Sequence, residues 1–272
     1  MKPLSSRFRS AFLVLFSFFV IPFGNVLAQQ GQGDLWALGN TSGAGGDPMS
    51  IYLLDQTTAA STLVASTSTA GLRGLAIDPT TGQMYSSYGS PNNTPNTGIV
   101  EIDKATGAVT AIGGTKYIVG LAFDSAGQLY GVENAGRGEG NIYTIDKTTG
   151  AESFLATVSA DSNPYGSDLA FDSSTQTLYL KGWPGGLWSV NTSTGDSTFL
   201  GLINLPYSTS KGFDFTESGD MFLHEHPCST CGDGLSSATS ADIFNPMNIA
   251  SSGVRVWSLA YHGVGLEKVD PV

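Results

Sequence analysis

The residues of this chain that are best suited to chemistry lie together in one short segment. Residues 224–231 read HEHPCSTC and hold both cysteines and two of the three histidines of the chain. Imidazole nitrogens and thiolate sulfurs are the ligands of tetrahedral zinc sites, so His224, His226, Cys228 and Cys231 are candidate metal ligands. In an exported protein, however, two close cysteines more often form a disulfide. We therefore expect a Cys228–Cys231 disulfide, with zinc binding and free thiols as the alternatives.

Outside this segment, the sequence has no motif that is typical of an enzyme. A G-x-S-x-G nucleophile elbow, a phosphate-binding loop and an H-E-x-x-H metalloprotease motif are all missing from it. The sequence therefore favours a binding or scaffold protein over an enzyme. We expect no cofactor, with calcium or zinc as the alternatives.

Residues 1–28 have the pattern of a signal peptide. Three basic residues precede an apolar run at residues 11–21, and small residues end at Ala28, which predicts cleavage before Gln29. A helix over this apolar run would be about 16 Å long, against a hydrocarbon core of roughly 30 Å, so the run is too short to span a membrane. We expect a secreted protein, periplasmic or extracellular, with no transmembrane segment after cleavage.

The charge of the mature chain limits its partners. The signal peptide holds three of the 12 Lys and Arg residues and none of the 23 Asp and Glu residues, so the mature net charge is −14. Binding to nucleic acid or to anionic membranes depends on Lys and Arg, and this charge disfavours both. A charged fraction of 13 % with 35 glycines fits strands joined by tight turns. We expect one domain over residues 29–272, acting as a monomer.

A short phrase recurs along the chain and predicts its architecture. Gly74–Asp78 reads GLAID, and related phrases follow at intervals of 46, 48 and 44 residues, at 120–124, 168–172 and 212–216. Each copy is followed by a turn and then by an apolar-aromatic pair such as Met84-Tyr85. A period in the mid-forties that is made of short strands is the signature of propeller blades.

A second phrase supplies the outer half of each repeat. It is an apolar-aromatic strand, in most copies ending in Asp or Asn, at residues 51–55, 99–103, 142–146, 187–191 and 256–260. Three copies continue into Thr-Gly, which suits a tight turn capped by the acidic or amide side chain. The two phrases together predict an all-β propeller of five blades with mainly four antiparallel strands each.

The two ends of the chain depart from this pattern. The first repeat, 34–66, has no innermost strand of its own, so we expect a three-stranded blade or one completed irregularly by residues 29–33 or by the last residues. With 256–260 taken as the third strand of the last blade, that blade carries an insertion at residues 224–253.

The motif G-L-A-[IF]-D … G-Q-[ML]-Y … [IL]-[YVW]-x-[IV]-[DN]-x-x-T-G resembles secreted propellers of the NHL, YVTN and gluconolactonase/strictosidine-synthase type. The resemblance implies the propeller fold and leaves the activity open. Its gluconolactonase branch implies an axial calcium held by Glu, Asn and Asp, for which Glu133-Asn134 is the matching pair. Its virginiamycin-lyase branch implies a His and a Glu near the axis, matched by His224-Glu225. The alternative function is thus a metal-dependent hydrolase or lyase, with its site at the axis or at residues 224–231.

The links between the predicted strands point to one binding face. Links from the second to the third strand, and from blade to blade, are long and irregular, and such loops on a rigid frame usually carry function. Aromatic side chains with a polar tip suit sugar rings or protein partners, although they can instead pack on loop backbone. We expect a glycan or an extracellular protein to bind this face through Tyr117, Tyr165, Tyr207, Trp183, Glu133 and Arg137.

Overall fold

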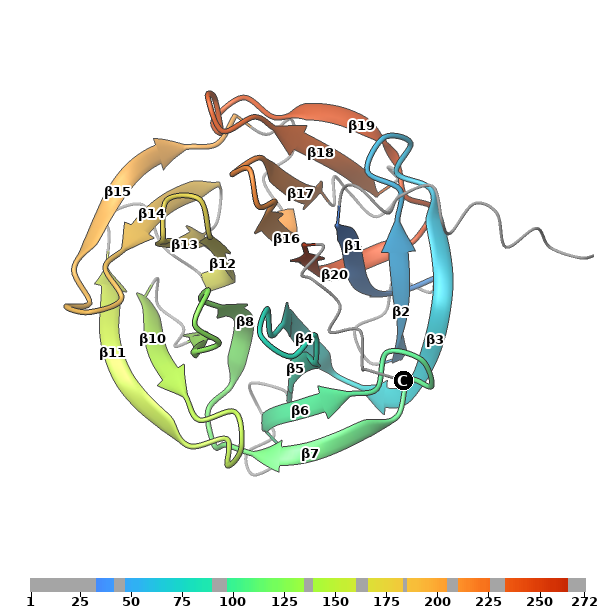
Figure 1. The fold of residues 1–272 in the computed structure, drawn as a ribbon, viewed down its shortest axis with the longest axis horizontal. Helices are drawn as coiled ribbons and strands as arrows, with labels where there is room; N and C mark the ends of the chain where they lie inside the picture. Colours follow the sequence, from blue (N-terminus) through green and yellow to red (C-terminus); the bar gives the residue numbers. More distant parts are fainter. Residues whose placement is uncertain are drawn as a thin grey trace, which may run out of the picture.

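The computed structural model of the chain describes residues 33–41, 47–89, 97–134, 139–159, 166–182, 185–204, 210–225 and 233–263. These residues form five four-stranded antiparallel sheets. Figure 1 shows the sheets arranged as blades around a central axis, which is a five-bladed β-propeller as the repeats predicted. The predicted signal peptide, residues 1–28, lies outside the described residues.

The four strands of each blade follow one another from the axis outwards (Figure 1). Blade 1 consists of β20 (Arg255–His262), β1 (Asp34–Asn40), β2 (Pro48–Leu54) and β3 (Ser61–Ala70). Blade 2 consists of β4 (Leu72–Ile77), β5 (Met84–Tyr88), β6 (Gly98–Ile102) and β7 (Val109–Gly113). Blade 3 consists of β8 (Ile118–Phe123), β9 (Leu129–Asn134), β10 (Glu139–Ile145) and β11 (Glu152–Ser159). Blade 4 consists of β12 (Gly166–Asp172), β13 (Thr177–Gly182), β14 (Gly186–Val190) and β15 (Ser197–Leu202). Blade 5 consists of β16 (Ser210–Phe215), β17 (Met221–Glu225), β18 (Gly234–Ala238) and β19 (Met247–Ser251).

The first blade is completed by the C-terminal strand. β20 pairs with β1 in an antiparallel register that runs from Asp34 opposite His262 to Asn40 opposite Arg255. The prediction that residues 256–260 form the third strand of the last blade is therefore wrong. These residues fit the outer phrase by composition, but Ser258 and the residues after it occupy the place of the GLAID phrase. The ring is thus closed by pairing of the two ends of the propeller, and the irregular completion expected for blade 1 does not occur.

The insertion predicted at residues 224–253 is likewise corrected. This stretch contains two ordinary blade strands, β18 and β19, and β18 pairs with β17 from Met221 opposite Ala238 onwards. The sequence pattern did not predict β18 and β19, because their sequences, GLSSA and MNIAS, lack the large apolar and aromatic residues of most other outer strands. Blade 5 therefore has the same four-stranded construction as the others.

Apolar side chains between adjacent blades form the core, in five buried clusters that each draw on two neighbouring blades. In one buried cluster, Ala122 and Val132 of blade 3 pack with Leu169, Leu180 and Trp188 of blade 4. Aspartates complete the short turns, since Asp78 Oδ1 accepts hydrogen bonds from the backbone and the hydroxyl group of Thr80 at 2.8 and 2.7 Å. The apolar core between the blades and the hydrogen-bonded turns hold the loops at the two faces of the ring in position.

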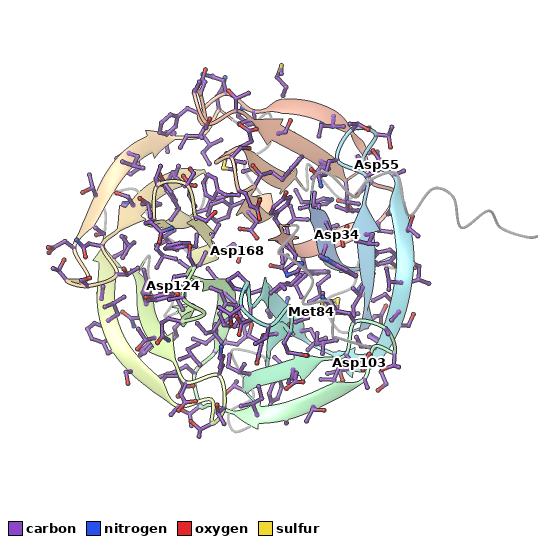
Figure 2. All side chains as sticks on the ribbon, in the orientation of Figure 1. Asp34, Asp55, Met84, Asp103, Asp124 and Asp168 are labelled. Atoms are coloured by element: carbon purple, nitrogen blue, oxygen red, sulfur yellow. The ribbon has the colours of Figure 1, made fainter. Side chains whose placement is uncertain are left out.

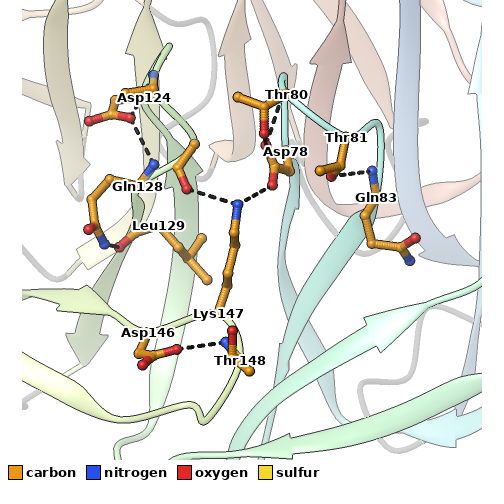
Figure 3. A network of polar contacts seen from close by, with 12 residues as sticks. Asp78, Thr80, Thr81, Gln83, Asp124, Gln128, Leu129, Asp146, Lys147 and Thr148 are labelled. Carbon is orange, nitrogen blue, oxygen red and sulfur yellow. Dashed lines mark hydrogen bonds and ion pairs between the residues drawn. The ribbon is translucent and has the colours of Figure 1, made fainter. Parts of the chain in front are cut away.

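A polar network also joins blades 2 and 3 (Figure 3). Lys147, in the β10–β11 turn, donates hydrogen bonds to Asp78 Oδ2 at 2.5 Å and to the carbonyl oxygen of Gly127 at 3.2 Å. Burial would raise the pKa of Asp78, but hydrogen bonds from Lys147 and Thr80 hold it below its ordinary value. The ionised form of Asp78 is therefore the one that ties the two blades together.

Candidate functional site

The links between strands divide the ring into two faces. The short-turn face holds the links from the first to the second strand of each blade, such as residues 78–83 and 124–128, and those from the third to the fourth. The irregular face holds the links from the second to the third strand and from blade to blade. The innermost strands run from the irregular face to the short-turn face, so their first residues lie at the irregular face.

Two of the predicted binding residues lie on the described part of the irregular face. Tyr117 precedes β8 directly and is half-buried. Glu133, near the end of β9, accepts hydrogen bonds at Oε2 from the hydroxyl group of Tyr143 at 2.8 Å and from Asn141 at 3.3 Å. Its Oε1 lies 3.8 Å from Nζ of Lys116. Glu133 is thus part of a local network that orders this face of blade 3.

The remaining predicted site residues are not placed by the structure, with one exception. The residues outside the described ranges are Arg137, Tyr165, Trp183, Tyr207, His226, Cys228 and Cys231. The exception is His224 in β17, which is fully buried, with Nε2 3.1 Å from the hydroxyl oxygen of Ser252. The Cys228–Cys231 disulfide and the zinc site both stay predictions.

Arg73 and Trp257 form a pair at the inner end of the irregular face that the sequence reasoning missed. They belong to the first residues of β4 and β20, and the Arg73 guanidinium lies 4.9 Å from the centroid of the Trp257 ring. Stacking of a guanidinium on an indole is a favourable cation–π contact. Within the described part of the chain, Nε of Arg73 is buried without a hydrogen-bond partner. The two residues are far apart in the sequence and come into contact because β20 lies beside β4 in the closed ring.

Asp168 is the polar centre of the ring. It occupies the position that is Gly74, Gly120 and Gly212 in three other inner strands and Ser258 in β20, and Figure 2 shows it close to the centre. Its Oδ2 accepts hydrogen bonds from the Ser258 hydroxyl group at 3.2 Å and from the backbone N–H of Phe213 at 3.4 Å. One carboxyl group therefore joins the inner strands β12, β16 and β20.

The pKa of Asp168 is far from its ordinary value. Burial raises it well above 3.8, and the nearby carboxylate of Asp214 raises it further. The backbone N–H of Leu169 and the ammonium group of Lys181 oppose this rise. Lys181 lies opposite Asp168 in the β12–β13 register and is itself only 2 % exposed.

A second axial carboxyl group, Asp214, stands where the other inner strands have Ala76, Ala122, Ala170 and Ala260. Its two oxygens accept backbone hydrogen bonds from Phe215 at 2.9 Å and from Tyr261 at 2.7 Å. It lines a cavity of about 180 Å³ on the axis, together with turn residues such as Pro79, Ser173 and Glu217. The cavity therefore belongs to the short-turn face, opposite the face that the sequence favoured.

The stability of the protein should fall as the pH rises from about 4 to 7, because of Asp214. Burial raises its pKa from 3.8 to about 7, against hydrogen bonds from Tyr261 and Phe215 that lower it. A carboxyl group with a raised pKa binds its proton more tightly in the folded state, so its contribution is complete below pH 3.8 and is lost as the pH passes 7. Asp214→Asn removes the part of this dependence that Asp214 contributes, while Asp168, whose pKa burial also raises, is retained in the variant.

Urea unfolding of the Asp214→Asn variant measures the effect. Relative to the wild type, the free energy of unfolding of the variant should increase between pH 5 and pH 8 by on the order of 1–3 kcal/mol. Asp103→Asn is the control, because Asp103 lies in an exposed turn and hydrogen bonds from Thr106 and Ala105 lower its pKa. The control should show no such change in this range. If the difference in free energy of unfolding between Asp214→Asn and the wild type is the same at pH 5 and at pH 8, the pKa of Asp214 is not raised.

The axial calcium that the gluconolactonase resemblance implies does not fit Glu133. Both oxygens of this carboxylate face donors of its own blade, Tyr143, Asn141 and Lys116. Within the described ranges, no three His, Cys, Asp or Glu side chains are grouped so that they could hold a metal ion. Glu133 therefore orders its own blade and does not match the calcium ligand that the resemblance implies.

The chain is similar in structure to solved propeller proteins. A chain of a nidogen–laminin complex aligns with a TM-score of 0.51 and 12% identity, over 84% of this chain and 98% of that chain. A gluconolactonase from Xanthomonas campestris aligns with a TM-score of 0.51 and 11% identity, over 84% and 79%. A Bacteroides thetaiotaomicron protein of unknown function gives 0.52 and 14%, over 86% and 65%. At these identities the likeness establishes the β-propeller fold alone.

No family model matches the chain, and no curated protein matches it. In the part of the chain that the structure describes, no helix has the length and apolar character needed to cross a membrane.

Proposed function

We propose that this chain is an exported, non-catalytic propeller that binds an extracellular protein or glycan through its irregular face, and that Arg73 and Trp257 belong to the binding surface. The observation that carries the proposal is the stacked pair of Arg73 and Trp257, two partly exposed side chains at the inner end of the irregular face. The guanidinium of Arg73 is held over Trp257, and its Nε has no partner within the described residues. Arg and Trp are the residue types that most often dominate binding energies at interfaces.

The use of the axial carboxyl groups also supports a frame rather than a reaction centre. Asp168 and Asp214 both accept backbone N–H groups from the inner strand of a neighbouring blade. Groups engaged in this way position the blades. The irregular face, on which Tyr117 lies and for which the sequence predicts the aromatics Tyr165, Tyr207 and Trp183, is then the face that we propose for binding.

Replacement of Arg73 tests this function. Pull-downs from the extracellular fraction of the native host and a glycan array should both be made with the wild type and with Arg73→Ala. We expect Arg73→Ala to weaken the retained interaction by at least about tenfold, as expected for a buried interface arginine.

Lys104→Ala is the matched control for this experiment. Lys104 also lies over a tryptophan, with Nζ 5.4 Å from the centroid of the Trp36 ring, but it belongs to the β6–β7 turn on the short-turn face. The control should bind like the wild type. Loss of binding in the control alone would place the partner on the opposite face and contradict the proposal.

The metal-dependent hydrolase or lyase is retained as the second candidate because a carboxyl group, Asp214, does reach into an axial cavity. Metal analysis of the purified protein separates the two functions. Bound calcium, magnesium or zinc would favour the enzyme. Absence of all three, with no rise in melting temperature when each is added, would remove it.

A further inference from the structure

The large apolar side chains that would anchor a protein partner lie away from the irregular face. Among the described residues, those that are exposed all belong to the outermost strands of the blades, and they are Leu63, Phe154, Phe199, Leu200, Leu202 and Met247. The centre of a protein–protein interface is built around apolar and aromatic anchors. At its inner end the irregular face offers a charged group on an indole, Arg73 on Trp257. A glycan therefore fits the described surface better than a protein.

The guanidinium group of Arg73 keeps its terminal nitrogens for a ligand. Within the described ranges, Arg73 donates no hydrogen bond and forms no ion pair. Its Nε is buried, whereas its two terminal nitrogens are not. Stacking on Trp257 occupies a face of the guanidinium plane and leaves the edge, where the N–H groups point. That edge matches a carboxylate, with which a guanidinium forms two parallel hydrogen bonds.

The charges of the inner strands are separated along the axis of the ring. A cation stands among the first two residues of three inner strands, at the irregular face: Arg73 in β4, Lys211 in β16 and Arg255 in β20. A carboxylate stands at the other end of three inner strands, at the short-turn face: Asp78 after β4, Asp124 after β8 and Asp172 at the end of β12. Five residues of extended strand separate Arg73 from Asp78, which is about 16 Å at roughly 3.3 Å per residue. This distance exceeds the Debye length of about 8 Å at physiological ionic strength, so the acidic turns repel an anion at Arg73 only weakly.

The carboxyl groups described nearer to the irregular face leave the charge of Arg73 uncompensated. Glu133 accepts hydrogen bonds from donors of its own blade. Asp168 is fully buried, and burial raises its pKa well above 3.8, so it is the carboxyl group that carries a negative charge least readily. Asp47 is exposed in the link before β2 and forms no ion pair with a described residue. The positive charge at Arg73 is therefore available to an anionic ligand.

We propose that the partner of the irregular face is an acidic polysaccharide, and that the guanidinium group of Arg73 pairs with the carboxylate of a uronic acid residue. The inference rests on the proposed function, because it names the class of partner for the same surface. The Trp257 ring holds the guanidinium in one orientation, so less side-chain freedom is lost when the paired hydrogen bonds form. The cations at the starts of β16 and β20 suit a polymer that carries a carboxylate on every sugar.

An array of polysaccharides of glucuronic, galacturonic, mannuronic and guluronic acid, each beside its carboxyl-reduced neutral form, tests the class of partner with the whole protein. We expect the wild type to bind at least one acidic form, and to bind the reduced form of the same polymer at least about tenfold more weakly. Arg73→Ala should lose at least about tenfold in affinity for the acidic form. Arg73→Lys should lose severalfold, because an ammonium group cannot form the paired hydrogen bonds. Salt at about 0.5 M should weaken binding severalfold relative to about 0.05 M.

Lys104→Ala is again the control and should bind the acidic form within about twofold of the wild type, and circular dichroism confirms that each variant is folded. Equal binding of the acidic and reduced forms, or no binding of any acidic form by the folded wild type, would overturn the acidic class. So would a protein partner that is lost with Arg73→Ala, although this result would leave the proposed function standing. A partner of any class that binds Arg73→Ala as well as the wild type would contradict the proposed function itself.

Discussion

A chain that ends after Gly253, and so lacks β20, is expected not to fold. This strand pairs with β1 over its whole length and buries Val256, Leu259 and Ala260 in the cores on both sides of blade 1. It also carries Ser258, whose hydroxyl group accepts the backbone N–H of Leu75 at 3.0 Å and donates to Asp168. Loss of these contacts exceeds the 5–15 kcal/mol by which a typical domain is stable, as an order-of-magnitude estimate.

Thermal unfolding followed by circular dichroism measures this effect. A chain that ends at Gly263 is the control, because it retains β20 entirely and should unfold cooperatively near the wild-type temperature. A cooperative, wild-type-like transition in the shorter chain would show that closure by β20 is dispensable.

Replacement of Gly120 by alanine is expected to destabilise the propeller by about 3 kcal/mol. A Cβ atom at this position would lie 2.5 Å from Cα of Asp168 and 2.8 Å from the backbone nitrogen of Leu169, so it would collide with the backbone of the next blade. The φ angle of Gly120 lies outside the left-handed region, so the cost comes from space alone.

Gly234→Ala provides the control, since among the described residues the added Cβ would meet the amide end of Asn248 at 3.0 Å and the carbonyl oxygen of Ala250 at 3.8 Å. Urea unfolding should separate the two variants by more than about 2 kcal/mol. Equal stability of both variants would mean that the inner strands of blades 3 and 4 are not packed as closely as described.

The repeats in the sequence were sufficient to predict the fold and the number of blades. The phrase at Gly74–Asp78 marks the innermost strand of a blade, and the outer phrase marks the third strand in most blades. Their recurrence therefore predicts the order of the strands along the chain. The last blade was misread because Val256-Trp257-Ser258-Leu259-Ala260 resembles Leu187-Trp188-Ser189-Val190-Asn191 in composition, and pairing between the two ends of a chain leaves no local signal. The strands β18 and β19 were missed for the opposite reason, because small and polar residues replace the expected apolar ones.

The candidate site was less predictable than the fold. Asp168 and Asp214 differ in the sequence from the Gly and Ala of the equivalent positions, and this departure from the repeat is the signal that could have pointed to them. Arg73 and Trp257 are far apart in the sequence, and only closure of the ring places them in contact.

The most direct test of partner binding at the irregular face is site-specific photo-crosslinking of the exported protein in its native host. A photoreactive amino acid is introduced in place of Arg73 in one variant and in place of Lys104 in another, and the products are identified by mass spectrometry. The proposed function predicts an adduct of defined mass at position 73 and none at position 104. Adducts at position 104 alone, or equal adducts at both positions, would contradict it.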